Sequence, residues 1–175
     1  MAPVEDPLAP LVEAASHGDD VAVGEIVRAT QADVLRICRH LGDPEDVEDL
    51  AQETYLRMLR ALPSFRGEAP VRVWLLSIAR RVCADHVRRR TRRRRLAQRG
   101  ISLRRDHVPA IDTGVDELLA ELDEDQRVAF VLTQVLELSY EEAAAVCGCP
   151  VGTIRSRVSR ARIGLTRRLD EAEAV

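Results

Sequence analysis

The chain has 175 residues, a formal net charge of −3 and a hydrophobic fraction of 46%, to which aromatic residues contribute only 3% of the chain. This length and composition suit one ordinary domain or two small helical domains with cores of Leu, Val, Ile and Ala. No apolar run approaches the roughly 18–20 residues that span a bilayer, and the acidic N-terminus lacks a signal-peptide pattern, so we expect a cytoplasmic protein without a membrane span.

The charges are distributed unevenly. Residues 88–105 carry ten arginines and no acid, and residues 154–168 carry six arginines and no acid. Residues 1–87, in contrast, hold 15 acids against nine arginines, and residues 106–153 hold 11 acids against one arginine. Alternating blocks of this kind are typical of a protein that contacts a polyanion with some faces and another protein with others.

Helical periodicity recurs along the first half of the chain. Helices are predicted around 8–17 and 20–40, and a third begins at Asp43, where a capping acid precedes Pro44 in the first helical turn. The apolar residues of this third helix form one stripe: Val47, Leu50, Ala51, Tyr55, Met58, Leu59 and Leu62.

A loop with proline and glycine breakers follows at 62–70, and the next helix is predicted from about 71 to 90, with Trp74 on its apolar stripe. Residues 91–113 lose the apolar rhythm and contain an arginine run. We interpret them as a flexible linker between a first domain at 8–90 and a second at 114–170.

The second domain contains a predicted helix-turn-helix. After apolar steps at 115–122 and 128–135, Ser139 and Glu142 form a capping box for a short helix that stops at Gly148. A last helix follows Pro150, and its inward-facing residues are Val151, Ile154, Val158, Ala161, Leu165 and Leu169.

The outward positions of this last helix are basic or polar. In a helix-turn-helix the second helix enters the major groove of DNA with its N-terminal residues against base edges. Arg155 and Ser156 lie where base edges are reached, and Arg160 and Arg162 lie further along, at the level of phosphates. The full predicted set is Thr153, Arg155, Ser156, Arg157, Ser159, Arg160 and Arg162.

Nothing in the sequence predicts an enzyme. The histidines are scattered, no phosphate-binding glycine loop occurs, and no nucleophile has a partner at a convincing spacing. Cys147 and Cys149 are one residue apart rather than at zinc-knuckle spacing, so neither a metal nor a cofactor is predicted.

At residues 122–127, 138–144, 152–157 and 160–162, the second domain resembles the fourth conserved region of extracytoplasmic-function sigma factors. The resemblance implies that this domain reads the −35 promoter element. Two positions depart from the family pattern, since the family usually has Pro at Asp123 and Gly at Glu137.

The first domain is similar to the second region of the same family. Residues 46–55 resemble the helix that binds the clamp helices of the polymerase's largest subunit, which implies a docking face of Asp46, Asp49, Leu50, Gln52 and Glu53. Residues 65–70, 74–81 and 85–89 resemble the unit that recognises and melts the −10 element. The implied −10 residues are Phe65, Arg66, Gly67, Glu68, Ala69, Arg80, Arg81, Asp85, Arg88 and Arg89.

The resemblance therefore implies an all-α initiation factor with two small domains and a flexible linker. Its expected partners are core RNA polymerase, through the clamp helices and the flap of the second-largest subunit, promoter DNA and an anti-sigma factor. Two alternatives stay open on the sequence: a stand-alone helix-turn-helix regulator, and an RNA-binding or protein adaptor that uses the arginine run.

Overall fold

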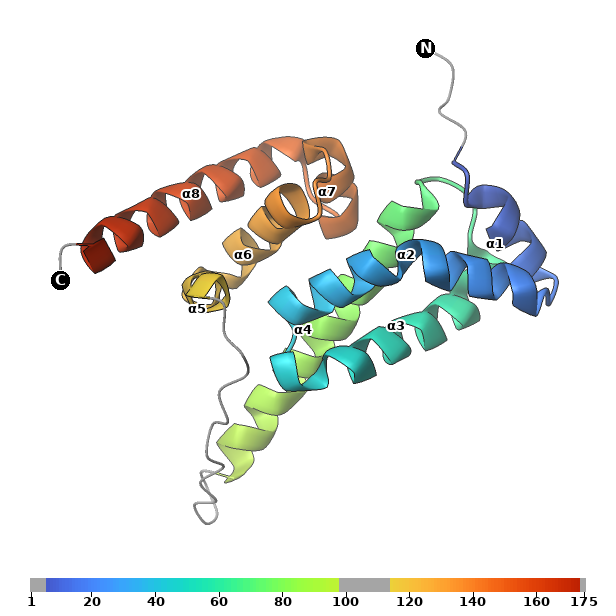
Figure 1. Cartoon of the computed structure of the whole chain (residues 1–175), viewed down its shortest axis with the longest axis horizontal. Coiled ribbons are helices and arrows are strands. Elements are labelled where there is room, and N and C mark those ends of the chain that lie inside the picture. Colours follow the sequence, from blue (N-terminus) through green and yellow to red (C-terminus); the bar gives the residue numbers. More distant parts are fainter. Residues whose placement is uncertain (1–5, 98–113, 174–175) are drawn as a thin grey trace.

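The computed structural model describes residues 6–97 and 114–173, and every regular element within them is helical (Figure 1). The all-α fold class is confirmed. The first half contains α1 (Ala9–Ser16), α2 (Asp20–Leu41), η1 (Pro44–Asp46), α3 (Val47–Ala61), η2 (Leu62–Ser64) and α4 (Val71–Ala97). The second half contains α5 (Gly114–Ala120), α6 (Glu124–Phe130), the π-helical segment η3 (Val131–Val135), α7 (Tyr140–Cys147) and α8 (Val151–Glu173).

Local chemistry accounts for the helix ends. The Asp19 carboxylate accepts hydrogen bonds from the backbone N–H groups of Val21 and Ala22, so α2 begins there. At its other end Gly42 leaves no room for a side chain, because a Cβ atom would lie 2.6 Å from the backbone carbonyl oxygen of Cys38 and 2.3 Å from Leu50 Cδ1. This close approach lets the chain turn from α2 through η1 into α3.

Helix α4 is longer than predicted. It continues to Ala97 rather than ending near residue 90, so the first residues of the predicted linker are helical. Arginine is a good helix former, and no Gly or Pro interrupts the chain before Gly100. The rest of the predicted linker, residues 98–113, lies outside the described residues.

Helices α2, α3 and α4 pack together as the core of the first half, and α1 lies across α2 and η2. Ile26, Ile37, Met58 and Leu75 are almost fully buried there. The predicted apolar stripe of α3 is correct except at Leu59, which is 40% exposed. Within the described residues, no helix is both long and apolar enough to cross a membrane.

In the second half, α8 packs on α6 and α7 and also contacts α5. Ile154, Val158 and Ala161 are buried, as predicted, but Leu169 is 48% exposed. The prediction that Leu169 faces inward was wrong because α8 extends beyond the helices that it packs against (Figure 1).

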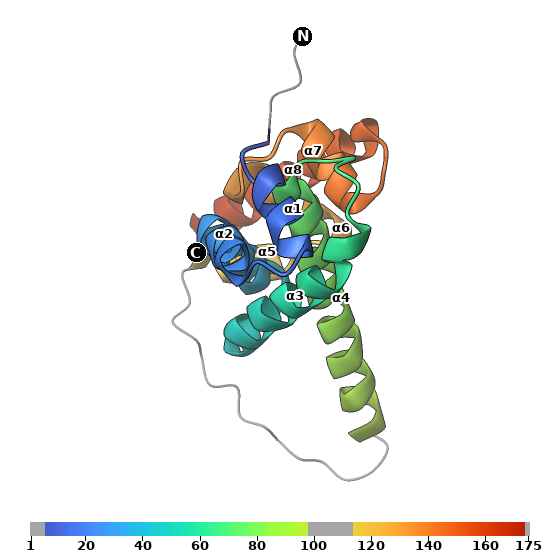
Figure 2. The same ribbon diagram turned by 90° about the vertical axis from the view of Figure 1, so that its right-hand side faces the viewer.

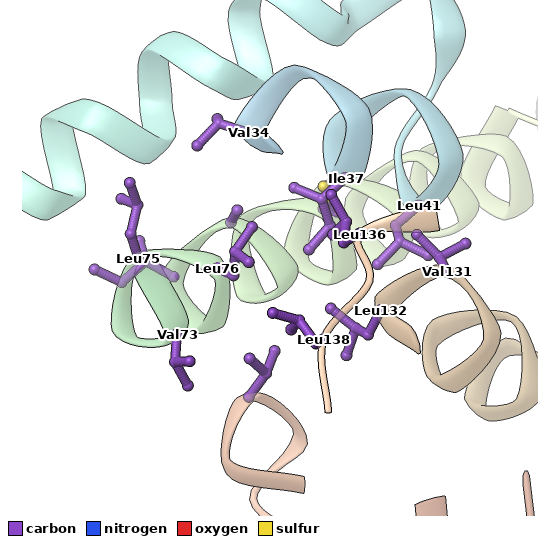
Figure 3. Packing of buried hydrophobic residues seen from close by; sticks show 14 of the residues in the cluster. Val34, Ile37, Leu41, Val73, Leu75, Leu76, Val131, Leu132, Leu136 and Leu138 are labelled. Atoms are coloured by element: carbon purple, nitrogen blue, oxygen red, sulfur yellow. The ribbon is translucent and has the colours of Figure 1, made fainter. Parts of the chain in front are cut away.

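The two halves share one hydrophobic core. Helix α7 contacts α4, and η3 contacts α2. Figure 2 shows α7 beside the start of α4. Figure 3 shows side chains of α2 and α4 gathered with Val131, Leu132, Leu136 and Leu138 of the second half, all of them buried.

Polar contacts tie the same interface. Arg72 Nη2 donates to the carbonyl of Leu136 at 2.8 Å while its Nε pairs with Asp33 at 2.6 Å. Arg80 Nε donates to the carbonyl of Val146 at 3.3 Å. Both carbonyls lie at helix C-termini, so arginines of the first half satisfy acceptors at two helix ends of the second half.

One backbone position next to this interface is strained. Glu137 has φ 55°, and it is the one non-glycine residue with positive φ within the described ranges. It follows η3 and lies between the buried residues Leu136 and Leu138. This geometry explains why the family usually has Gly here, since glycine adopts positive φ at no steric cost.

Replacing Glu137 by glycine should therefore raise the free energy of unfolding by about 0.5–1 kcal/mol, because relief of the left-handed strain exceeds the added entropy of an unfolded glycine. Chemical denaturation of the purified chain measures the change. Gly148→Ala is the matched reverse substitution, since Gly148 has φ 65° and open space around its Cβ position, and it should be destabilising. A Glu137→Gly variant less stable than wild type would contradict this account.

Candidate nucleic-acid interfaces

The helix-turn-helix forms as the sequence predicts. Ser139 Oγ accepts from the Glu142 N–H at 3.1 Å, and the Glu142 carboxylate accepts from the Ser139 N–H at 2.8 Å, which completes the capping box. At the other end of α7, Gly148 adopts a left-handed conformation and the Cys149 N–H donates to the Ala144 carbonyl at 3.1 Å. The turn between α7 and α8 is thereby fixed.

The seven predicted residues of α8 divide into two groups. The exposed residues are Arg155, Ser159, Arg160 and Arg162, and the partly buried residues are Thr153, Ser156 and Arg157. Arg155 lies over the Tyr140 ring at 5.9 Å and 3.9 Å from a Glu141 carboxylate oxygen, so it stays close to the start of α7.

Two of the predicted arginines brace α8 instead of projecting freely. Arg157 pairs with Asp125 of α6 and donates to Cys149 Sγ at 3.8 Å. Arg162 donates to Gln134 Oε1 at 2.8 Å. The most open cations of this face are therefore Arg155 and Arg160, the latter hydrogen-bonded to Ser156 within its own helix.

The departure at Asp123 has a structural explanation. Asp123 is the N-cap of α6, and its carboxylate accepts from the Asp125 N–H at 3.1 Å. An aspartate can begin a helix in this way where the family usually uses proline.

The loop ahead of α4 forms a pocket of about 270 Å³. The Phe65 and Trp74 rings lie 4.6 Å apart at its side, tilted by 45°. The prediction that Trp74 belongs to the core is only partly correct, because the indole is half-buried and lines this pocket. The pocket is lined by Ser64, Phe65, Arg66, Glu68, Ala69, Val73, Trp74, Ser77 and, from α7, Ala145.

The remaining −10 residues predicted on α4 have different surroundings. Arg81, Arg88 and Arg89 are exposed, whereas Arg80 is partly buried beneath α7. Asp85 is turned toward α3, where it accepts from Arg57 Nη1 at 2.8 Å, and it also accepts from Arg88 at 2.8 Å.

This ion-pair network shifts two pKa values. The Arg57 guanidinium, followed by that of Arg88, lowers the pKa of the Asp85 carboxyl below its usual value. Hydrogen bonds first from Asp85 and then from Glu53 raise the pKa of Arg57. Asp85 is thus held as a carboxylate that links α3 to α4.

The predicted polymerase-binding face lies on α3 and lines a second groove of about 220 Å³. Asp49 and Gln52 are exposed, and Asp46 and Glu53 are partly exposed. Leu50, only 4% exposed, belongs to the core at the floor of the groove and offers packing rather than an exposed contact.

The sequence reasoning missed an apolar part of this face. Leu56 and Leu59 are 41% and 40% exposed. They follow Asp49 and Gln52 at steps of three and four residues, so they lie on the same side of the helix. That spacing is the signal that would have identified them.

One group of side chains within residues 6–97 and 114–173 has the composition of a metal site. Ligand atoms of Asp43, Asp46 and His86 lie within 4.8 Å of one another. The Arg90 guanidinium already pairs with Asp43, and His86 Nε2 lies 3.1 Å from Asp46. A cationic side chain in contact with the most buried ligand disfavours a metal ion there.

The four cysteines are buried or partly buried. Cys38 and Cys83 are buried, and burial raises the pKa of the partly buried Cys147 thiol to about 11. A thiol with a raised pKa carries little of the thiolate that metals and oxidants require.

Comparison with known proteins identifies both halves. Residues 26–93 match the family model described as sigma-70 region 2, and residues 113–163 match sigma-70 region 4. The chain is 46% identical over 164 residues to a protein named ECF RNA polymerase sigma factor SigC of Mycobacterium tuberculosis, covering 89% of this chain and 87% of that one. It is 33% identical over 177 residues to the RNA polymerase sigma-H factor of Pseudomonas aeruginosa, covering 91% and 92%.

Solved structures give the same result. CnrH in complex with the cytosolic domain of CnrY is 31% identical, with a TM-score of 0.73 over 93% of this chain and 96% of that one. RpoE in complex with the anti-sigma factor NepR from Bartonella quintana is 29% identical, with a TM-score of 0.71 over 84% and 96%.

Because Asp85 links α3 to α4, Asp85→Asn should lower the free energy of unfolding at pH 7 and leave it unchanged at strongly acidic pH. A carboxyl whose folded pKa lies below its unfolded value near 3.8 contributes stability above that value, and the contribution is lost as pH falls through the folded pKa. The stability difference between wild type and variant should therefore close below pH 3.8, as measured by denaturation at a series of pH values. Asp170→Asn, an exposed Asp-to-Asn control, should show no such difference.

Proposed function

Because this chain belongs to the extracytoplasmic-function sigma factors of the sigma-70 family, it directs RNA polymerase to promoters, and we propose that three of its surfaces divide that work. The family match disfavours a stand-alone helix-turn-helix regulator. The observation that carries the proposal is the separation of charge on one body: the exposed acidic face of α3 and the exposed arginines of α8 belong to different halves.

The first surface is the outer face of α8, which reads the −35 duplex. Arg155 lies in the first turns of this helix, where base edges come within reach, and its guanidinium can donate two hydrogen bonds to guanine. Arg160, one turn further on, suits phosphate. Arg157 and Arg162 have a supporting role, because their contacts with Asp125 and Gln134 hold α8 against α6 and η3.

The second surface is the loop and pocket ahead of α4, which hold the parted −10 strand. Capture of an unstacked base requires a recess with an aromatic or apolar wall, and the backbone of the strand requires cations beside it. The Phe65–Trp74 pair supplies the wall, and Arg81, Arg88 and Arg89 supply exposed cations.

This surface is partly covered in the free chain. Ala145 of α7 lines the pocket, and the Val146 carbonyl holds Arg80. Engagement of the −10 strand by Arg80 therefore requires α7 to move away from α4.

The third surface is the acidic face of α3, which docks on the clamp helices of the polymerase's largest subunit. Asp49 and Glu53 offer charge to a basic partner, and complementary charge sets register and association rate. Leu56 and Leu59 add apolar area next to these acids.

Two further partners complete the proposal. Ile163 and Leu169, 67% and 48% exposed in the C-terminal half of α8, suit contact with the flap of the second-largest subunit. The likeness to sigma factors solved with their inhibitory partners supports an anti-sigma factor for this chain. The chain acts as a regulatory subunit of polymerase in the cytoplasm and leaves the nucleotide chemistry to the core enzyme.

Run-off transcription with purified core polymerase tests the whole function, and failure to initiate on any promoter of a genomic library would refute it.

The docking face is tested separately. Asp49→Arg should reduce the affinity of the chain for core polymerase by about a hundredfold or more, because a like charge facing a basic surface costs several kcal/mol. Fluorescence titration of the labelled chain with core measures the loss. Glu48→Arg adds the same charge at the adjacent position of the helix and should bind core more tightly than Asp49→Arg, and equal losses would remove Asp49 from the docking face.

Arg155→Ala should relax discrimination at one base pair of the −35 element by about 1–3 kcal/mol, because a two-pronged contact to a base edge is lost. Arg160→Ala is the matched control and should weaken binding to all sequences alike. Selection from a randomised −35 library with the holoenzyme separates the two outcomes. An unchanged base preference for Arg155→Ala would assign base reading to other residues of α8.

A further inference from the structure

Asp6 lies twenty residues ahead of the segment that matches sigma-70 region 2, yet it contacts the start of α4. It precedes α1, which packs on α2 and η2. In both views α1 lies close to the segment that leads into α4 (Figures 1 and 2).

The Asp6 carboxylate joins two helix N-termini. Its Oδ1 accepts from the Leu8 N–H at 3.0 Å, at the start of α1, and its Oδ2 accepts from the Val71 N–H at 2.5 Å, at the start of α4. The Asp6 carbonyl also accepts from the Ala9 N–H at 3.0 Å. A carboxylate is favoured at such positions because both helix dipoles present their positive ends to it.

The bond to Val71 has no ready substitute. The Val71 residue is fully buried, so water cannot easily replace the carboxylate, and an unsatisfied N–H group at this depth is costly. The same burial argues against a strand phosphate at this helix end, since α1 and Asp6 would first have to leave.

Val71 also marks the end of the loop that forms the pocket. The start of the loop is held by the Phe65 N–H, which donates to the Leu62 carbonyl at 3.1 Å. Among the described contacts, no backbone hydrogen bond holds residues 66–69, and Gly67 turns the chain with φ 69°. The position of the loop therefore depends on its two ends. The second end is held by the Trp74 N–H, which donates to the Pro70 carbonyl at 2.9 Å, and by Asp6, which is the one contact from outside α4 and the loop among these hydrogen bonds.

We propose that Asp6 is a positioning residue for −10 strand recognition: it clamps the first turn of α4 and thereby holds the 65–70 loop and the Phe65–Trp74 pocket in shape. This inference rests on the proposed role of that pocket. It assigns a part in promoter opening to a residue outside the matched region.

Trp74 provides a direct readout, because it is the only tryptophan of the chain and it lines the pocket. Asp6→Ala should increase the quenching of its fluorescence by acrylamide by about twofold, since loss of the buried hydrogen bond loosens the loop against the indole. Asp6→Asn keeps one acceptor oxygen and should lie between wild type and Asp6→Ala. Glu13→Ala removes a carboxylate from the exposed side of α1 and is the matched control.

The second readout is binding of the holoenzyme to single-stranded DNA that carries the −10 segment of a promoter transcribed by wild type. Asp6→Ala should weaken this binding about tenfold, the equivalent of one buried charged hydrogen bond. Affinity of the chain for core polymerase and of the holoenzyme for −35 duplex should stay within about twofold of wild type. Glu13→Ala should match wild type in all of these measurements.

Three results would overturn the inference. The first is unchanged quenching of Trp74 in Asp6→Ala, and the second is tighter strand binding by this variant, which would make Asp6 a competitor of phosphate. The third is an equal loss of affinity for the strand and for core polymerase, which would mean that Asp6 contributes only to the general stability of the fold. If wild type itself fails to join core polymerase or to capture the strand, the proposed function fails instead. The Trp74 measurement needs no polymerase and tests the clamp in either case.

Discussion

Helix α4 is packed on two sides at once, and the rest of the structure depends on this constraint. Its apolar residues join α2 and α3 in the first half and meet Leu136 and Leu138 of the second half, so one core runs through both (Figure 3). Only the remaining side of α4 is free for exposed arginines such as Arg81 and Arg88. A helix buried on two sides cannot shift without disturbing both halves, so the buried first turns of α4, residues 71–83, are held in place.

The arginines of this chain have two roles: some hold the fold together, and others are exposed to a partner. The contacts of each side chain distinguish the two roles. Arg72 and Arg80 satisfy carbonyls at the C-terminal ends of helices in the second half, and Arg157 braces α8 through Asp125. Arg155 contacts only the Tyr140 ring and Glu141 at the start of α7, Arg81 has no such tie among the described contacts, and both stay exposed. An arginine-rich sequence is therefore not a uniform DNA-binding surface, because some of its guanidinium groups donate to carbonyl or carboxylate oxygens within the protein.

The acidic and basic faces are also connected. Glu53 and Asp85 both pair with Arg57, so the proposed docking face of α3 and the proposed strand-binding side of α4 share one network. Strong ion pairs in a partly exposed site hold side-chain geometry more than they add stability. Glu53, which belongs to the proposed docking face, thus also takes part in the network that holds Asp85 and α4.

By itself the sequence determined the helices, the capping box at Ser139, the turn at Gly148 and the family, because these depend on local periodicity, capping chemistry and short motifs. Tertiary structure alone decided which residues of those motifs are available. Leu59 and Leu169 follow the apolar period yet are exposed, Leu50 lies inside a docking motif yet is buried, and Asp6 lies outside every motif yet holds the start of α4. The physical reason is that periodicity states which side of a helix a residue occupies, whereas burial and hydrogen-bond partners depend on where distant segments end and how far each helix extends past its neighbours.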